Sequence, residues 1–231
     1  MLDYISKIFR IFNLRIMQTK KLPIKDSHYF WVLDPGHGGV LDGVYQTKGK
    51  RSPVWEDGSV YYEGEGNRFI IADIAKELDN LGIHYGFTVH PDDPKDVPLR
   101  DRVKIADGFN FKRKIGISNH SDGFSNPSAH GHTVYTSVGE TQSDKVATIF
   151  HEEAKKVFPN MKFRTDKKDG DPDKESQFYI LRKTAMPFIL LENFFHTNPL
   201  ECKTILMTKE GRAKIVKYIV NAIIRIEKYG L

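Results

Sequence analysis

The sequence predicts an α/β fold: a single domain built on a twisted, mostly parallel sheet that is flanked by helices on both faces. Two observations predict this class. Short β-branched and aromatic runs alternate with longer segments whose apolar residues recur at helical spacing. Three of these runs are followed directly by polar residues, as is typical of open sheets that hold a ligand at their strand ends. The 231 residues suffice for one such domain, and they contain no internal repeat.

The expected strands are short and rich in Val, Ile and aromatic residues. In chain order they cover residues 29–34, 83–89, 114–118, 133–136 and 188–191. Residues 40–64 are rich in Gly, Lys, Tyr and Ser, so we expect a long loop there that holds at most a small hairpin. Loops of that length inside a compact domain are usually functional or disordered. The polar residues 164–175 are expected to form a second, exposed loop.

The expected helices are separated from the strands by Gly, Pro or polar residues. They cover residues 65–81, 97–106, 143–157 and 209–229, with a short additional helix at Pro199. Gly82 ends the first of them, and Asn198 is placed to cap the short one. The last helix carries a core-facing apolar stripe, which consists of Ile215, Ile219, Ile223 and Ile226.

The net charge of +5 lies entirely in the first 25 residues. The remainder is balanced, which argues against a nucleic-acid-binding protein. Residues 1–25 form a basic amphipathic segment that docks on the domain, is disordered, or contacts an anionic membrane surface, and residues 26–231 form the domain. Arginines interrupt any apolar core of a signal peptide, so we expect synthesis in the cytoplasm. No apolar run is long enough to span a membrane.

Polar side chains follow three of the predicted strands. His37, His120 and Glu192 stand at these ends, and Glu65 begins the helix after the first loop, so all four belong to one edge of the sheet. The single cysteine, Cys202, excludes a cysteine-rich metal site. Two imidazoles and a carboxylate suit zinc, and a second carboxylate could act as general base.

Each of these residues also has a simpler interpretation. Glu65 could only complement the helix dipole, and His120 could only form a hydrogen bond at its strand end. Glu192 follows an apolar run and precedes two phenylalanines, so it would be partly buried and would need a partner or a raised pKa.

Four stretches resemble, in the same order, the motifs of the zinc-dependent N-acetylmuramoyl-L-alanine amidases, the class with a His-Glu-His metal site. They are Asp34-Pro35-Gly36-His37-Gly38-Gly39, Glu65-Gly66-Asn67, Ser118-Asn119-His120-Ser121-Asp122 and Leu191-Glu192-Asn193-Phe194-Phe195-His196-Thr197-Asn198. The resemblance runs from about residue 28 to the C-terminus, and the segments Tyr62–Arg68 and Gly49–Pro53 look most like the phage and prophage branch.

This resemblance implies a site and an activity. His37, Glu65 and His120 would hold one Zn²⁺, and Glu192 would be the catalytic carboxylate. The substrate would be peptidoglycan, cut at the amide between N-acetylmuramic acid and L-alanine, as in an endolysin that reaches the cell wall through a pore or lysis system. Two alternatives stay open: a zinc peptidase or amidase that cuts another peptidoglycan amide, and a non-catalytic wall-binding or tail structural protein.

The sequence departs from the family pattern at three places. Phe194 stands where the last motif usually has glycine, and His196 and Thr197 replace small residues. The additional histidine could bind substrate or cap a turn. Glu63 lies two residues from Glu65, so it could replace Glu65 as ligand, although Glu65 keeps the spacing to Asn67.

Overall fold

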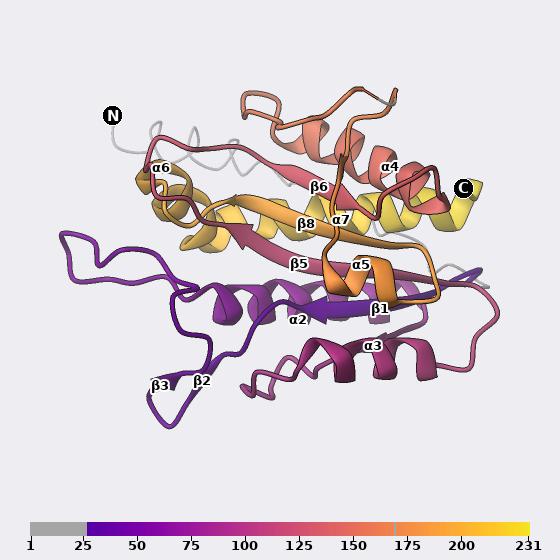
Figure 1. Cartoon of the computed structure of the whole chain (residues 1–231), viewed down its shortest axis with the longest axis horizontal. Helices are drawn as coiled ribbons and strands as arrows, with labels where there is room; N and C mark the ends of the chain where they lie inside the picture. The colour runs from indigo at the N-terminus through magenta and orange to yellow at the C-terminus, as the bar shows by residue number, and fades with distance from the viewer. Residues whose placement is uncertain (1–26, 169) are drawn as a thin grey trace, which may run out of the picture.

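The computed structural model describes residues 27–168 and 170–231, so the predicted N-terminal segment lies outside the described residues. Its centre is a six-stranded sheet of order β4-β1-β5-β8-β6-β7. Figure 1 shows β1, β5, β8 and β6 side by side in this sheet. The strands are β1 (Phe30–Pro35), β4 (Tyr85–Phe87), β5 (Lys114–Asp122), β6 (Thr133–Thr136), β7 (Lys174–Glu175) and β8 (Phe188–Phe195). All neighbouring pairs are parallel except β6 with β8. The predicted fold class is therefore confirmed.

Helices cover both faces of this sheet. On one face α7 (Lys209–Tyr229) packs against α2 (Glu63–Leu81) and α4 (Gln142–Val157), while α3 (Leu99–Gly108) packs against α5 (Tyr179–Lys183) on the other. Alternate strand residues enter the two cores, as the pleat requires. The larger core, on the side of α2, α4 and α7, takes Trp31, Leu33, Ile115, Ile117, Ile189 and Leu191, and the smaller core takes Phe30, Val32, Phe188 and Leu190.

The central strands are longer than the sequence predicts. Both β5 and β8 continue through their polar motifs, because each has a hydrogen-bonded neighbour there: His120 pairs with Glu192, and Glu192 pairs with Thr133. The expected small hairpin is present as β2 (Val40–Leu41) and β3 (Val44–Tyr45). The sequence does not predict α5, β7 or the π-helical turn η1 (Cys202–Leu206), which follows α6 (Pro199–Glu201). Asn198 caps α6 as predicted, since its side chain accepts a hydrogen bond from the Glu201 amide at 3.0 Å.

Phe194 has an uncommon backbone conformation. Its φ of +67° lies in the left-handed region, where a side chain with a Cβ costs about 1–2 kcal/mol. The ring is fully buried and lies against Phe158, with centroids 4.9 Å apart, and against His132, with centroids 6.0 Å apart. Glycine is the residue that adopts this conformation without strain, which explains why the related motif has glycine here. In this chain, aromatic packing offsets the strain.

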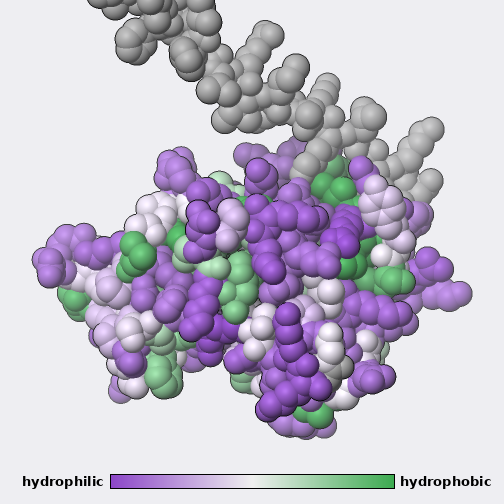
Figure 2. All heavy atoms as spheres, turned by 90° about the horizontal axis from the view of Figure 1, so that it is seen from above, coloured by the Kyte–Doolittle hydropathy of each residue, from purple (hydrophilic) through white to green (hydrophobic). Residues whose placement is uncertain are grey.

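The surface is mainly polar where Figure 2 shows it, with apolar side chains scattered in small groups between the charged ones. Such scatter is usual for globular proteins. None of the described helices is at once long enough and apolar enough to cross a bilayer.

Candidate active site

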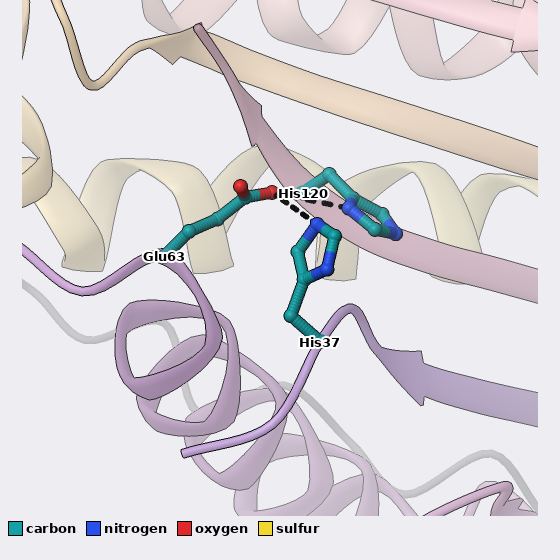
Figure 3. Close-up of side chains that lie close together, drawn as sticks. All are labelled: His37, Glu63 and His120. Atoms are coloured by element: carbon teal, nitrogen blue, oxygen red, sulfur yellow. Dashed lines mark hydrogen bonds and ion pairs between the residues drawn. The ribbon is translucent and has the colours of Figure 1, made fainter. Parts of the chain in front are cut away.

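Two predicted ligands, His37 and His120, meet the alternative ligand Glu63 at the carboxyl ends of β1 and β5. His37 lies just after β1, His120 lies within β5, and Glu63 is the first residue of α2 (Figure 3). The Oε1 atom of Glu63 is 3.2 Å from His37 Nε2 and 3.1 Å from His120 Nδ1. One ligand atom from each residue lies within 4.8 Å of the other two, which is close enough to share one ion.

The structure corrects one expectation: Glu63, and not Glu65, lies with the two histidines. Helix α2 begins at Glu63, two residues earlier than the sequence predicts, and residues two apart on a helix do not face the same way. Glu65 therefore turns toward the hairpin, where its Oε1 accepts a hydrogen bond from the Val40 amide at 3.1 Å. Asn67 follows Glu63 by four residues, which is the spacing that places both on one helix face.

Close backbone packing puts Glu63 in position. A Cβ on Gly64 would lie 1.9 Å from the Gly38 carbonyl oxygen, and a Cβ on Gly36 would lie 2.2 Å from the His120 ring. These glycines let the start of α2, the turn after β1 and the His120 ring approach one another. The glycine-rich motifs that the sequence offers thus serve the geometry of the site.

The tautomer of His120 follows from its neighbours. The Ser118 hydroxyl donates its proton to Asp34 Oδ2, so it must accept from His120 Nε2, which lies 3.1 Å away. Nδ1 is then the unprotonated nitrogen, and it points at Glu63 Oε1. Burial lowers the pKa of His120, which keeps the ring neutral, as a metal ligand must be.

This donor set fits a divalent metal of zinc's class. A nitrogen lone pair of His120 faces a carboxylate oxygen at 3.1 Å, which is unfavourable unless a cation lies between them. The other oxygen of Glu63, Oε2, is buried without a hydrogen-bond partner. Burial would raise the pKa of Glu63, but a proton on the neighbouring His120 or His37 ring holds it below its ordinary value, so the carboxylate stays ionised. Imidazole nitrogen and carboxylate oxygen are typical zinc ligands. In the described part of the chain, the other acidic cluster (Asp144, Asp171, Asp173) contains no histidine.

His37 is held by its backbone. Its φ of +66° is left-handed, a conformation that persists only where the surroundings determine it. Arg68 Nη1 and Arg102 Nη2 donate to the His37 carbonyl oxygen at 2.8 and 2.9 Å. Arg102 Nη1 also donates to Asp34 at 2.8 Å and to the Pro35 carbonyl at 2.6 Å. Burial would raise the pKa of Asp34, but the Arg102 charge and hydrogen bonds hold it below its ordinary value.

An Arg102→Met variant is expected to lose about 3–5 kcal/mol of unfolding free energy, because it leaves the Asp34 carboxylate buried and uncompensated. Both side chains of this ion pair are 2% exposed. Urea denaturation measures the change. Arg100→Met is the matched control, since that side chain is 85% exposed, and it should change stability by less than about 0.5 kcal/mol. Equal stability of the two variants would contradict this account of Arg102.

Glu192 lies in β8 directly opposite His120. Its Oε2 is buried and has no hydrogen-bond partner in the structure. Burial raises the pKa of Glu192 well above its ordinary value, and the charges of Glu63 and Asp122 add to the shift. The sequence expectation for Glu192, a carboxylate with a raised pKa at this edge, matches this environment.

The raised pKa of Glu192 gives a prediction for the metal-free protein. A carboxyl whose folded pKa exceeds its unfolded pKa stabilises the fold at low pH, and this contribution is lost as pH rises toward the folded pKa. As pH rises above the unfolded pKa of about 4.3, wild-type protein in chelator should therefore lose melting temperature relative to Glu192→Gln, which cannot ionise. Thermal unfolding of both proteins across this range measures the difference. A difference that is constant with pH would be evidence against the raised pKa.

His196 also reaches the site edge. Its ring is 3% exposed, and Nδ1 lies 3.0 Å from the Ser121 carbonyl oxygen and 3.9 Å from Glu63 Oε2. The sequence did not predict roles for Arg68, Arg102 or Asp34. The buried acid of the Asp-Pro-Gly-His stretch is a signal for a buried basic partner, but the sequence does not show which arginine that is.

Comparisons with known proteins identify the family of this chain. The family description "N-acetylmuramoyl-L-alanine amidase" matches residues 32–225. The N-acetylmuramoyl-L-alanine amidase AmiA of Salmonella typhimurium is 26% identical, over 84% of this chain and 74% of its own length. The probable cell wall amidase LytH of Staphylococcus saprophyticus is 30% identical, over 81% of this chain and 55% of its own length.

Solved structures share the fold. An N-acetylmuramoyl-L-alanine amidase from Clostridium difficile 630 superposes with a TM-score of 0.70 at 22% identity, and covers 88% of this chain and 99% of its own. The catalytic domain of CwlV from Bacillus (Paenibacillus) polymyxa gives 0.68 at 20% identity, over 87% and 98%. Since the family match spans most of the sheet, its helices and every residue of the site, this chain belongs to the N-acetylmuramoyl-L-alanine amidase family and is an amidase of peptidoglycan.

Proposed function

We propose that this chain is a zinc-dependent amidase in which His37, Glu63 and His120 hold one metal ion and Glu192 transfers the proton. The observation that carries the proposal is the position of Glu63 Oε1, 3.2 Å from one imidazole nitrogen and 3.1 Å from the other. The bond cut is the amide that joins the lactyl group of N-acetylmuramic acid to L-alanine.

The chain's own residues divide the chemistry. A zinc ion, when bound, supplies a Lewis acid for the scissile carbonyl and lowers the pKa of the attacking water. Glu192 takes a proton from that water and gives one to the departing L-alanine amine, which leaves a lactyl carboxylate. The buried surroundings of Glu192 suit this role, because a raised pKa brings the carboxyl closer to the working pH.

The function is tested by digesting purified peptidoglycan with this protein and identifying the products by mass spectrometry. The expected products are free lactyl-muramic ends and stem peptides with a free L-alanine amine. Their formation should stop in chelator and return with added zinc. Cleavage inside the stem peptide or a cross-bridge would instead identify an amidase or peptidase for another bond. Binding to sacculi without any product would identify a wall-binding protein.

We further propose a lytic, endolysin-like role, which rests on the resemblance of residues 49–53 and 62–68 to the phage and prophage branch. Rapid clearing of a suspension of sacculi would support it. Slow trimming of stem peptides that leaves the sacculi intact would contradict it.

A further inference from the structure

A continuous network of buried, hydrogen-bonded polar side chains lies beside the site. The Tyr218 hydroxyl donates to Asn193 Oδ1, and Asn193 Nδ2 donates to Asn119 Oδ1 at 2.9 Å. Asn119 Nδ2 then donates to Asn67 Oδ1 at 3.0 Å, and Asn67 Nδ2 donates to the Gly36 carbonyl oxygen at 3.1 Å. At the far end, His132 Nε2 lies 3.0 Å from the Tyr218 hydroxyl. Four of the side chains come from α2, β5, β8 and α7, and His132 immediately precedes β6.

The hydrogen bonds of this network run in one direction. The Tyr218 proton goes to Asn193, so Tyr218 must accept from His132. Each amide oxygen accepts from the preceding member, and each amide nitrogen donates to the next one. This order fixes the orientation of all three amides, and bonds that run in one direction polarise one another.

The two central asparagines occupy core positions. Ile115 and Ile117 of β5 and Ile189 and Leu191 of β8 face the larger core, and by the period of two Asn119 and Asn193 continue these rows. Asn67, Asn119 and Asn193 are all 0% exposed. Burying an amide is unfavourable unless it is hydrogen-bonded, and aliphatic side chains would fill the same space without that requirement. The fold therefore gains something other than packing from these amides.

The positions of the asparagines show what this is. Asn119 and Asn193 are the sequence neighbours of His120 and Glu192, and Asn67 lies one helical turn after Glu63. The network ends on the backbone carbonyl of Gly36, the residue before His37. Asn193 also reaches the backbone carbonyl of His120, at 3.3 Å. Each residue of the proposed site thus lies next to a residue of the network in the sequence, or one helical turn from it.

We propose that His132, Tyr218, Asn193, Asn119 and Asn67 are positioning residues that together fix the spacing of His37, Glu63, His120 and Glu192, an inference that rests on the function proposed above. We infer that the network acts on the site through the backbone and not by direct contact with the metal or the substrate. It acts by setting the register between two strands, one helix and one turn.

Zinc affinity, measured by competition with a chromophoric chelator, tests the network. Asn119→Leu keeps the branched shape of the side chain but removes both central links. We expect zinc to bind about 10- to 100-fold more weakly, the effect that is typical of lost groups behind metal ligands. Tyr218→Phe removes only the outer donor and keeps the ring, so it should weaken binding in the same direction but less.

Ile117→Ala is the matched control, because Ile117 lies two residues before Asn119 on the same face of β5. It should lower thermal stability while leaving the zinc affinity of the folded protein within about threefold of wild type. Thermal unfolding in chelator shows that each variant is folded when it is titrated. With zinc in excess, kcat of Asn119→Leu on a soluble muropeptide should fall while KM stays unchanged.

The outcomes separate this proposal from the proposed function. If wild-type protein binds no zinc, the metal site itself is wrong. If wild type binds zinc and Asn119→Leu and Tyr218→Phe bind it equally well, only the network is overturned. A loss of affinity in Ile117→Ala as large as that in Asn119→Leu would also overturn it, because general destabilisation would then explain the effect. Should Asn119→Leu not fold, Tyr218→Phe decides between these outcomes.

Discussion

Glu192→Gln is expected to lose about 10²–10⁴-fold in turnover while it retains zinc, because it removes the proposed general acid and base but none of the proposed ligands. Glutamine has nearly the same shape, and it is neutral where Glu192 is held near Glu63 and Asp122. The variant should therefore fold at least as well as wild type in the absence of metal. Steady-state release of L-alanine amines from peptidoglycan, together with zinc content by atomic absorption, measures both properties.

The matched control is Glu77→Gln on the exposed face of α2, which should leave turnover unchanged. A Glu192→Gln enzyme that keeps wild-type turnover would remove Glu192 from the mechanism. A variant that loses zinc together with activity would instead make Glu192 a ligand.

Glu63→Gln is expected to abolish stoichiometric zinc binding, with an affinity lower by at least about 100-fold, because the carboxylate between the two imidazoles is lost. Glu65→Gln is the natural comparison. It is two residues away and carries the same change, but its Oε1 is engaged with the Val40 amide. We expect its zinc affinity to stay within about tenfold of wild type. Equilibrium dialysis of both variants decides the assignment.

The reverse result, with Glu65→Gln losing the metal and Glu63→Gln retaining it, would return the ligand role to Glu65. His37→Ala should behave like Glu63→Gln, since it removes a nitrogen donor. Full zinc occupancy in His37→Ala would contradict the whole ligand set.

The sequence predicted the sheet and its edge because those depend on local signals. The runs that form β1, β5 and β8 are apolar and short, and a histidine or glutamate marks where β1, β5 and β8 approach the site. It placed the start of α2 two residues too late, because Glu63-Gly64-Glu65-Gly66 holds two acids and two glycines and no capping residue at its start. That small error decided the choice between Glu63 and Glu65.

Other parts of the site could not be predicted from one sequence. Arg102 reaches Asp34 from a helix 68 residues away, and a spacing of that kind leaves no local pattern. The same is true of Asn119 and Asn193, whose partners come from other elements. Their polar side chains at positions of apolar period were visible, but only the fold shows which amides meet.

The left-handed backbone of Phe194 bears on how such chains diverge. Phe194→Gly would relax the backbone by about 1–2 kcal/mol, yet it would empty a site that Phe158 and His132 line, and emptying a buried aromatic site costs about 3–5 kcal/mol. Glycine, the usual residue of the motif that this stretch resembles, should therefore be a poor substitute here. The aromatic side chain at this position therefore depends on the residues packed around it. Replacing it without a loss of stability would require changes at several of these residues together.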